Sequence, residues 1–478
     1  MRNILLISYH EWQQKRRSGL LMLMFFSIQA LLLVILLTGW TQYNVTKQQQ
    51  QDAQAIVQEQ WLAQPDRHPH RVAHFGHFTF RPPSALSFFD NGINHFVGNS
   101  IYIEAHKQNS AMFSGSQQSD VLLRFSDLSV STVLLLCWPL LLIALGYNCI
   151  SAEYTNGTLK QLFAMSISPQ SILAGKALTY LFISVLFIVP VFLASTGLIV
   201  WSDIAITGDV LLRIASLFLL YLGYCAIWVG IVLLISSVVR YAPHALALLI
   251  AIWFVLTIVS PRILADFAAD KYSFPSRNAF NQEIRQAISK VGDSHNPDDP
   301  HFSEFKMQIL AKYQVDRVED LPVNYRALVI QEGERISAEI YTQKFNEIIA
   351  QQQKQQAFIR YWYWLNPYLL VRDLSMAISA TDVWHFYDYE RQTEQHRFAR
   401  ISKLNEVHAE HIDQAHDRGS TADALHWQSF NDFHYQPKQL KQSLMPFKST
   451  WLILAVLIGL LVTLFILPSA NRRFHELA

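Results

Sequence analysis

Residues Ser131 to Trp201 read STVLLLCWPLLLIALGYNCI, then SAEYTNGTLKQLFAMSISPQSILAGK, then ALTYLFISVLFIVPVFLASTGLIVW. Two uncharged apolar runs flank a polar segment, residues 151–176, that contains one Glu, one Pro, two Gly and two Lys. About 20 apolar residues in a helix span the ~30 Å hydrocarbon core of a bilayer. The stretch therefore predicts two membrane helices joined by a short polar connection.

The same kind of apolar run occurs six times along the chain of 478 residues. The six runs are residues 19–40, 131–150, 177–201, 210–239, 244–264 and 450–467. Hydrophobic residues make up 51% of the chain and charged residues only 16%, against roughly a quarter in soluble proteins. We therefore predict an α-helical integral membrane protein with six transmembrane helices. Arg213 is a charge inside the fourth run, and we expect it to snorkel from its helix end.

The distribution of basic residues predicts the orientation of these spans. Lys and Arg gather in residues 1–18, in residues 151–176, at Arg240 and in the tail at 468–478, whereas the loop SDIAIT at 202–207 has none. Cytoplasmic loops carry the excess of Lys and Arg in membrane proteins. We expect both termini in the cytoplasm, with residues 1–18 forming a helix along the membrane surface.

Residues 41–130 and 265–449 then lie outside the cytoplasm, and both are too long for simple loops. The first begins with a polar helix pattern at 44–64 and continues with short aromatic strands and turns. The second contains helical patterns at about 325–358 and 383–418, which we interpret as two long helices packed against each other. Together the two insertions predict a mainly α-helical outer domain with some β-structure.

An aromatic link, Tyr361 to Trp364, joins the two long helices. Such rings suit a membrane–water interface, because they present an apolar body and a polar edge. They equally suit the core of the outer domain, and the sequence leaves both readings open. Pro367 and the flanking charges argue against a seventh full span here.

The polar segment at 151–176 contains the pattern EYTNGTLKQLFAM, which predicts a short amphipathic helix. Leu159, Leu162 and Phe163 fall on one face of it. Gly157 allows a bend or a close backbone approach.

This segment resembles the coupling segment of type-2 ABC exporter permeases. The matching residues are Glu153, Gly157-Thr158-Leu159, Leu162, Pro169 and Gly175-Lys176. The outer stretches at 73–83, 102–109 and 365–386 look like one poorly characterised branch of these permeases. That branch carries large periplasmic insertions after helices one and five.

The resemblance implies a transmembrane permease subunit in the bacterial inner membrane, with its large domain in the periplasm. It implies docking of an ABC ATPase subunit at Glu153, Gly157, Thr158, Leu159, Leu162 and Phe163. ATP and Mg would bind to that partner and no cofactor to this chain. It further implies a second permease subunit, the same chain or a similar one, and export of a substrate or its extraction from the membrane.

The residues themselves support a motor on another chain. No Walker A pattern is present, since Gly175-Lys176 is followed by Ala177 instead of Ser or Thr. Asp, Glu, Lys and His are absent from the centres of the spans, so no ion relay is visible. Zinc-protease, serine-hydrolase and cysteine-pair motifs are missing as well, and we expect no catalysis by this chain. The net charge of +1 gives no reason to expect a nucleic-acid partner.

Histidines raise the one further question, because fifteen of the eighteen lie in the two outer segments. They are His68, 70, 74, 77, 95 and 106, and His295, 301, 385, 396, 408, 411, 416, 426 and 434. His408 and His411 share a helix face by spacing, and imidazole binds zinc, copper or nickel. Solvated outer surfaces also carry histidine without metal, and we expect no metal here. The alternatives left open are a mechanical transducer acting on a periplasmic or outer-membrane partner, and a metal-handling membrane protein.

Overall fold

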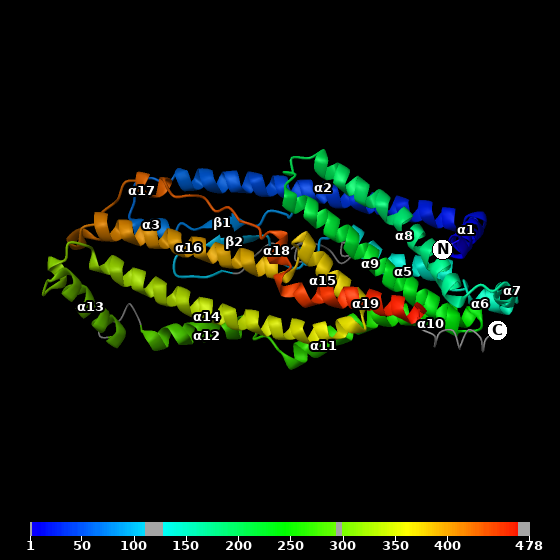
Figure 1. The fold of residues 1–478 in the computed structure, drawn as a ribbon. Helices are drawn as coiled ribbons and strands as arrows, with labels where there is room; N and C mark the ends of the chain where they lie inside the picture. The colour runs from blue at the N-terminus through cyan, green and yellow to red at the C-terminus, as the bar shows by residue number, and fades with distance from the viewer. Residues whose placement is uncertain (1, 110–127, 293–298, 467–478) are drawn as a thin grey trace.

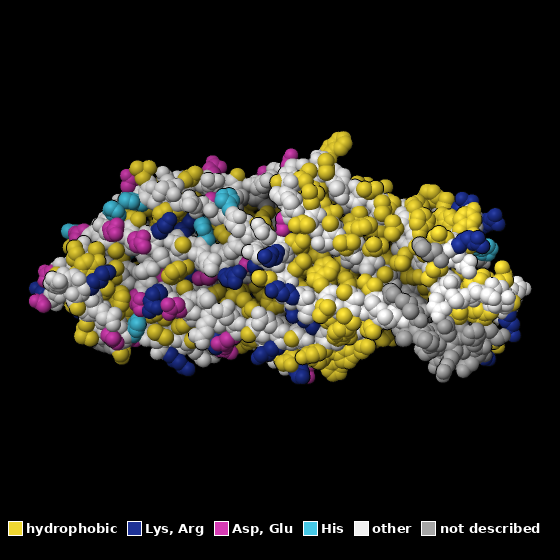
Figure 2. All heavy atoms as spheres, in the orientation of Figure 1, with side chains coloured by type: hydrophobic (Ala, Val, Ile, Leu, Met, Phe, Trp, Pro, Cys, Tyr) yellow, Lys and Arg dark blue, Asp and Glu magenta, His cyan; other side chains and the backbone are white. Residues whose placement is uncertain are grey.

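The computed structural model describes residues 2–109, 128–292 and 299–466. The chain forms an elongated molecule with two halves, and the N-terminus lies at the end of the half that holds the apolar helices (Figure 1). Hydrophobic side chains cover the visible surface of that half, whereas charged side chains and histidines are scattered over the other half (Figure 2). We call them the membrane half and the outer half. The predicted tail at 468–478 lies outside the described residues.

The membrane half is a bundle of helices, and five of them are long and apolar enough to cross a membrane. These five are α2 (Leu20–Leu62), Val130–Thr155 with α5 (Val130–Gly146) and α6 (Ser151–Thr155), α8 (Pro169–Val200), α9 (Gly208–Val238), and Ala242–Lys271 with α10 (Ala242–Phe254), a π-helical turn η2 (Val255–Val259) and α11 (Ser260–Lys271). The remaining helices of this half are α1 (Arg2–Arg17), α7 (Thr158–Ala164) and α19 (Lys448–Ile466). An integral membrane protein is thus what the sequence and the structure both indicate.

The sixth predicted span, residues 450–467, corresponds to α19. Among the described residues the apolar helix there is shorter, Met445–Leu460, so a sixth crossing stays a prediction. The orientation of the termini and the periplasmic placement of the outer half stay predictions too.

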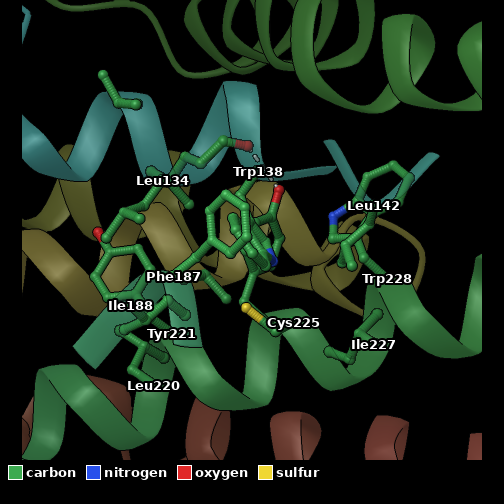
Figure 3. Close-up of a cluster of buried hydrophobic side chains, with 14 of the residues drawn as sticks. Leu134, Trp138, Leu142, Phe187, Ile188, Leu220, Tyr221, Cys225, Ile227 and Trp228 are labelled. Atoms are coloured by element: carbon green, nitrogen blue, oxygen red, sulfur yellow. Dashed lines mark hydrogen bonds between the residues drawn. The ribbon is translucent and has the colours of Figure 1, made fainter. Parts of the chain in front are cut away.

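The core of the bundle is filled by large aromatic and aliphatic side chains. Trp138 of α5, Phe187 of α8, and Tyr221 and Trp228 of α9 pack together (Figure 3). Trp138 and Phe187 meet edge to face with their ring centroids 5.2 Å apart, the arrangement that favours aromatic pairs. Three spans are thereby fixed against one another.

The outer half is built from the two insertions. Its elements are the distal part of α2, α3 (Pro69–Ala73), β1 (His77–Phe80), β2 (Ser100–Ile103), α12 (Arg277–Val291), α13 (Pro300–Tyr313), η3 (Val318–Asp320), α14 (Tyr325–Tyr361), η4 (Trp362–Trp364), α15 (Pro367–Ser379), α16 (Val383–His411), η5 (Gln414–His416), α17 (Leu425–Gln428), α18 (Leu440–Ser443) and η6 (Met445–Phe447). The two strands pair antiparallel, with His77 opposite Ile103 and Phe80 opposite Ser100.

The two long helices expected in the second insertion are α14 and α16, which lie side by side (Figure 1). The polar helix expected at 44–64 is not a separate element. It is the continuation of the first span, since α2 runs unbroken for 43 residues from the membrane half into the outer half. No Gly or Pro interrupts the polar part of α2, so nothing in its local chemistry ends the helix at the end of the apolar run.

The residues of the aromatic link lie in two different environments, one buried in the protein and one partly exposed. Tyr363 is fully buried and its hydroxyl donates to Asp373, whereas the side chains of Trp362 and Trp364 are 40% and 45% exposed. The link leads into α15, a helix of 13 residues that is buried on nearly all sides among α9, α5 and α19. This short buried helix was not among the elements predicted from the sequence.

Arg213 does not snorkel into water, contrary to the expectation from the sequence. Its side chain is buried at the outer end of α9, where the guanidinium pairs with Asp209 at 2.7 Å. The same guanidinium donates to the carbonyl oxygens of Ile378 at 2.6 Å and Lys438 at 2.7 Å. Because Ile378 lies in the last turn of α15, the arginine satisfies a helix-end carbonyl that has no partner within the helix. Arg213 therefore fastens α9 to the outer half.

Candidate functional site

A buried cluster of charges lies around Lys176, near the start of α8. This is the end of the membrane half farther from the outer half, and we call it the inner end (Figure 1). The Lys176 ammonium lies 2.7 Å from Oε2 of Glu11 in α1 and 2.6 Å from Oε1 of Glu153 in α6. The lysine side chain is only 2% exposed. A charge in a low-dielectric interior is strongly disfavoured unless it is paired and hydrogen-bonded, and here one cation serves two carboxylates from different helices.

Glu11 is the second buried member of this cluster. Burial raises the pKa of its carboxyl, but the charges of Lys176 and Lys15 and hydrogen bonds from Lys176 and Tyr180 outweigh burial and hold the pKa below its usual value. The Tyr180 hydroxyl donates to Glu11 Oε1 at 2.8 Å. Glu11 is therefore ionised at neutral pH and attaches α1 firmly to α8.

The predicted coupling segment, residues 151–176, begins with the short helices α6 and α7, which are joined at a sharp bend. Gly157 adopts φ +75° at the bend, a left-handed conformation that residues with a Cβ adopt only with strain. The Thr158 hydroxyl donates to the carbonyl of Glu153 at 3.2 Å across the bend. The bend turns α7 away from the bundle axis, so that the segment projects at the end of the molecule (Figure 1).

The six residues that the resemblance assigned to ATPase docking differ in how far they are exposed. Leu159 is only 2% exposed and belongs to the core of the bundle. Leu162 and Phe163 are half-buried and pack against that core, and Glu153 is occupied by Lys176. Thr158 is exposed together with its neighbours Lys160, Gln161 and Met165. The apolar face thus holds α7 to its own chain, and the exposed face is mainly polar.

Contact between α1 and α8 is unusually close at Gly175. A Cβ at this position would lie 2.8 Å from the side chain of Ile7 and 2.9 Å from the carbonyl of Ile4. The Ser8 and Thr179 hydroxyls meet at 3.0 Å nearby. The Gly-Lys pair at the start of α8 therefore has two structural roles: the glycine admits α1, and the lysine binds it.

Sequence reasoning missed Glu11 as the partner of Lys176. A signal was present, since Glu11 is the only acidic residue in α1, next to several apolar residues and a basic end. A single carboxylate on the apolar side of a surface helix needs a buried cation, and Lys176 is the nearest candidate in the bundle.

The start of the predicted coupling segment is also bonded to α9. The Ser236 hydroxyl accepts hydrogen bonds from the backbone N–H groups of Ile150 at 3.0 Å and Ser151 at 3.3 Å. These two groups precede and begin α6, where the first N–H groups of a helix have no partner within the helix. Ser236 therefore caps α6 from a neighbouring span and ties the coupling segment to α9.

Two groups of side chains in the described outer half have the spacing needed to hold a metal ion. His70, His74 and His106 form one group, and His68, His408 and Asp417 form the other. Burial, reinforced by the neighbouring His74 and His106, lowers the pKa of His70 to about 4. His408 and His411, which share a helix face by spacing, have different partners. The His411 ring lies tilted against that of His426, with centroids 4.3 Å apart, and His408 bonds Asp417 at 2.7 Å. His295 lies outside the described residues.

Two family models match different parts of the chain. One is described as "ABC-2 family transporter protein" and matches residues 102–260, which include the coupling segment and α8 and α9. The other is described as "Domain of unknown function (DUF3526)" and matches residues 277–436, which include α12 to α16. No curated protein matches the chain, and no solved structure does either.

Proposed function

We propose that this chain, a type-2 ABC permease whose residues 102–260 belong to the ABC-2 transporter family, is driven by ATP hydrolysis on a separate ABC ATPase subunit. The observation that carries the proposal is the coupling segment: α7 presents an exposed, mainly polar face while Glu153 at its base is bonded to a buried lysine. Force applied to such a segment reaches the spans directly, because a buried ion pair with two carboxylates resists separation.

The connections from the coupling segment suggest how motion would travel outward. Through Glu153 the segment is joined to Lys176 of α8 and thereby to α1. Through Ser236 it is joined to α9. At its other end α9 is fastened by Arg213 to α15 and to the region before α18. A helix of 31 residues is about 46 Å long, so α9 would act as a rigid rod between the ATPase side and the outer half.

The assembly we propose contains two permease subunits, identical or similar, and two ATPase subunits that bind ATP and Mg between them. The supporting observation is the low burial of two spans: only 22% of the apolar window of α2 and 17% of that of Ala242–Lys271 is buried within the chain. These faces are available to lipid and to a second copy. The π-helical turn η2 interrupts the second of them, and such turns are frequent at functional positions.

Export, or extraction of a substrate from the membrane, follows from the same family resemblance, as does placement in a bacterial inner membrane with six spans and the outer half in the periplasm. A second candidate is a mechanical transducer that transports nothing and moves the outer half against a periplasmic or outer-membrane partner. The filled core of the bundle around Trp138 and Trp228 favours it, since a path for a substrate would then have to form between two copies.

Charge reversal on the exposed face of α7 tests the ATPase contact. We expect Lys160→Glu together with Gln161→Glu to reduce the amount of ATPase that copurifies with the permease at least tenfold. The two substitutions remove one positive charge and add two negative charges on the exposed face of α7 without touching the core. Lys354→Glu, an exposed lysine of α14, is the matched control and should leave copurification unchanged.

Thermal unfolding of each variant separates lost docking from lost folding. Full copurification and full ATPase stimulation with the doubly substituted α7 would overturn the proposed contact. To separate the two candidate functions, labelled Gln353→Cys on α14 reports motion of the outer half when ATP is added. Motion without movement of any added substrate would favour the transducer.

A further inference from the structure

Three histidines of the first insertion converge at one place, on the side of the outer half where α3 meets the turn after β2. His70 and His74 lie at the second residue and the C-cap of α3, one helical turn apart. His106 comes from the turn at Glu104–Lys107 that follows β2. One ring nitrogen from each of the three lies within 4.8 Å of one from each of the others.

The spacing matches that of metal ligands. Zinc binds imidazole nitrogen at about 2.0–2.1 Å in tetrahedral sites, which sets neighbouring ligand nitrogens about 3.3 Å apart. The Nε2 atoms of His70 and His74 are 3.3 Å apart. The ring centroid of His106 lies 5.5 Å from that of His70 and 5.2 Å from that of His74. His74 and His106 are exposed, so their rings can rotate to close the remaining gap around an ion.

A buried carboxylate orients the third histidine. Nδ1 of His106 lies 2.6 Å from Oε1 of Glu334, and the backbone N–H of His106 donates to the same oxygen at 2.6 Å. This leaves Nε2 of His106 free to bind an ion. A histidine ligand usually donates its other ring N–H to a carboxylate or carbonyl, which fixes the ring and raises its basicity.

The carboxylate is itself held in place. Glu334 of α14 is fully buried and pairs with Arg397 of α16 at 3.1 Å. His106 has φ +62°, a left-handed conformation that is uncommon for a residue other than glycine. Backbone strain of this kind is retained where the surroundings over-determine it, commonly at functional sites.

We propose that His70, His74 and His106 bind a divalent transition-metal ion of the zinc class. Three imidazoles favour zinc, copper or nickel over calcium and magnesium, which prefer oxygen ligands. Three protein ligands leave a fourth position open to water or an exogenous group. The bound ion would join the first insertion, through its three ligands, to α14 and α16 of the second insertion, through Glu334 and Arg397.

The neighbouring group of His68, His408 and Asp417 is not the site. Asp417 already accepts from Asn324 at 2.8 Å and pairs with Arg326 at 3.2 Å, and that arginine repels a cation. His68 instead accepts from the backbone N–H of His70 and caps α3. This group positions α3 and so positions two of the proposed ligands.

Metal binding to the purified full-length chain, produced without a polyhistidine tag, tests the proposal. We expect one equivalent of Zn²⁺ to bind and to raise the temperature of unfolding. Co²⁺ in its place should give the visible absorption of a tetrahedral nitrogen site. His70→Gln and His106→Asn should each weaken binding 10–100-fold; asparagine tolerates the left-handed backbone at 106.

His434→Gln, at an exposed histidine of the same outer half, is the control and should bind as the parent chain does. Glu334→Gln keeps a side chain of the same size and should weaken Zn²⁺ binding by about tenfold. Absence of a Zn²⁺ equivalent in the parent chain would overturn the proposal. So would binding by both ligand variants that equals the parent, measured on variants shown to be folded by circular dichroism. Either result leaves the ATPase contact untouched, because the two sites lie in opposite halves of the molecule.

Discussion

The membrane half and the outer half are held together in different ways. In the membrane half apolar side chains form one large core, and the buried charges gather at its two ends, around Lys176 and around Arg213. In the outer half the apolar clusters are small, and buried polar contacts such as Glu334–Arg397 run between helices along its length. The membrane half contains few buried charges, and each of them joins particular helices at one end of the bundle. The outer half contains many, and together they hold its helices in place.

The largest effect should follow removal of the cation at the inner end. Lys176→Met leaves Glu11 without its main buried partner, and breaking a buried pair costs about 3–5 kcal/mol. We expect a correspondingly large drop in the unfolding temperature in detergent or nanodiscs. Lys160→Met, at an exposed lysine of α7, should change it little.

A double substitution tests whether the uncompensated charges cause the loss of stability. Lys176→Met combined with Glu11→Gln removes one of the two uncompensated charges and should recover part of the loss. If Lys176→Met alone were as stable as the parent, the cluster would not hold α1 and α6 to α8, and the force path proposed from the coupling segment would fail.

The next largest effect concerns the outer half. Arg397→Met leaves the buried carboxylate of Glu334 without its cation, which we expect to cost about 3 kcal/mol. Arg335→Met, on the same helix as Glu334, removes a partly exposed arginine paired with Glu332 and Glu339, and exposed pairs contribute about 0–1 kcal/mol. Chemical denaturation with a chelator present measures both without any metal contribution. Equal losses would show that burial does not distinguish these pairs.

The smallest effect tests the boundary between the halves. A spin label at Trp362→Cys, in a background lacking the three native cysteines, should collide with oxygen and with a water-soluble nickel complex to intermediate extents, because position 362 would lie at the membrane surface. Labels at Leu193→Cys in α8 and Gln353→Cys in α14 give the apolar and aqueous limits. Collision rates at 362 equal to those at 353 would place the aromatic link in water. Stability should stay within about 0.5 kcal/mol.

Much of the membrane half was predictable because the signal is local. An apolar run long enough to span a bilayer needs no partner to be recognised, and helices form wherever backbone groups must be satisfied without water. The bend at Gly157 was likewise readable from residue type, whereas α8 begins at Pro169, eight residues before the predicted span at 177–201. Where such a helix ends was not readable for α2, because a polar sequence continues a helix as well as an apolar one does when a second insertion packs against it.

The candidate site was predictable only in part. The resemblance assigned ATPase docking to residues 151–176, which stays a prediction, and the inclusion of Leu159 assumed that an apolar stripe is a docking surface. In the fold the same stripe packs on the chain's own bundle. Glu153 was assigned through the resemblance alone, whereas its bond to Lys176 joins residues 23 positions apart and the bond from Lys176 to Glu11 joins residues 165 positions apart.

By itself, the sequence determined that this chain is a helical membrane protein with two large insertions and no ATPase motif, because composition, hydropathy and short motifs are properties of neighbouring residues. Tertiary structure alone decided which charges pair, how α15 is buried among the spans, that Arg213 turns to protein carbonyls, and that three histidines from α3 and the turn after β2 meet beside Glu334. Those outcomes depend on contacts between segments that are distant in the sequence. The residues next to a histidine or an acidic residue in the chain do not indicate which partner will contact it in the folded protein.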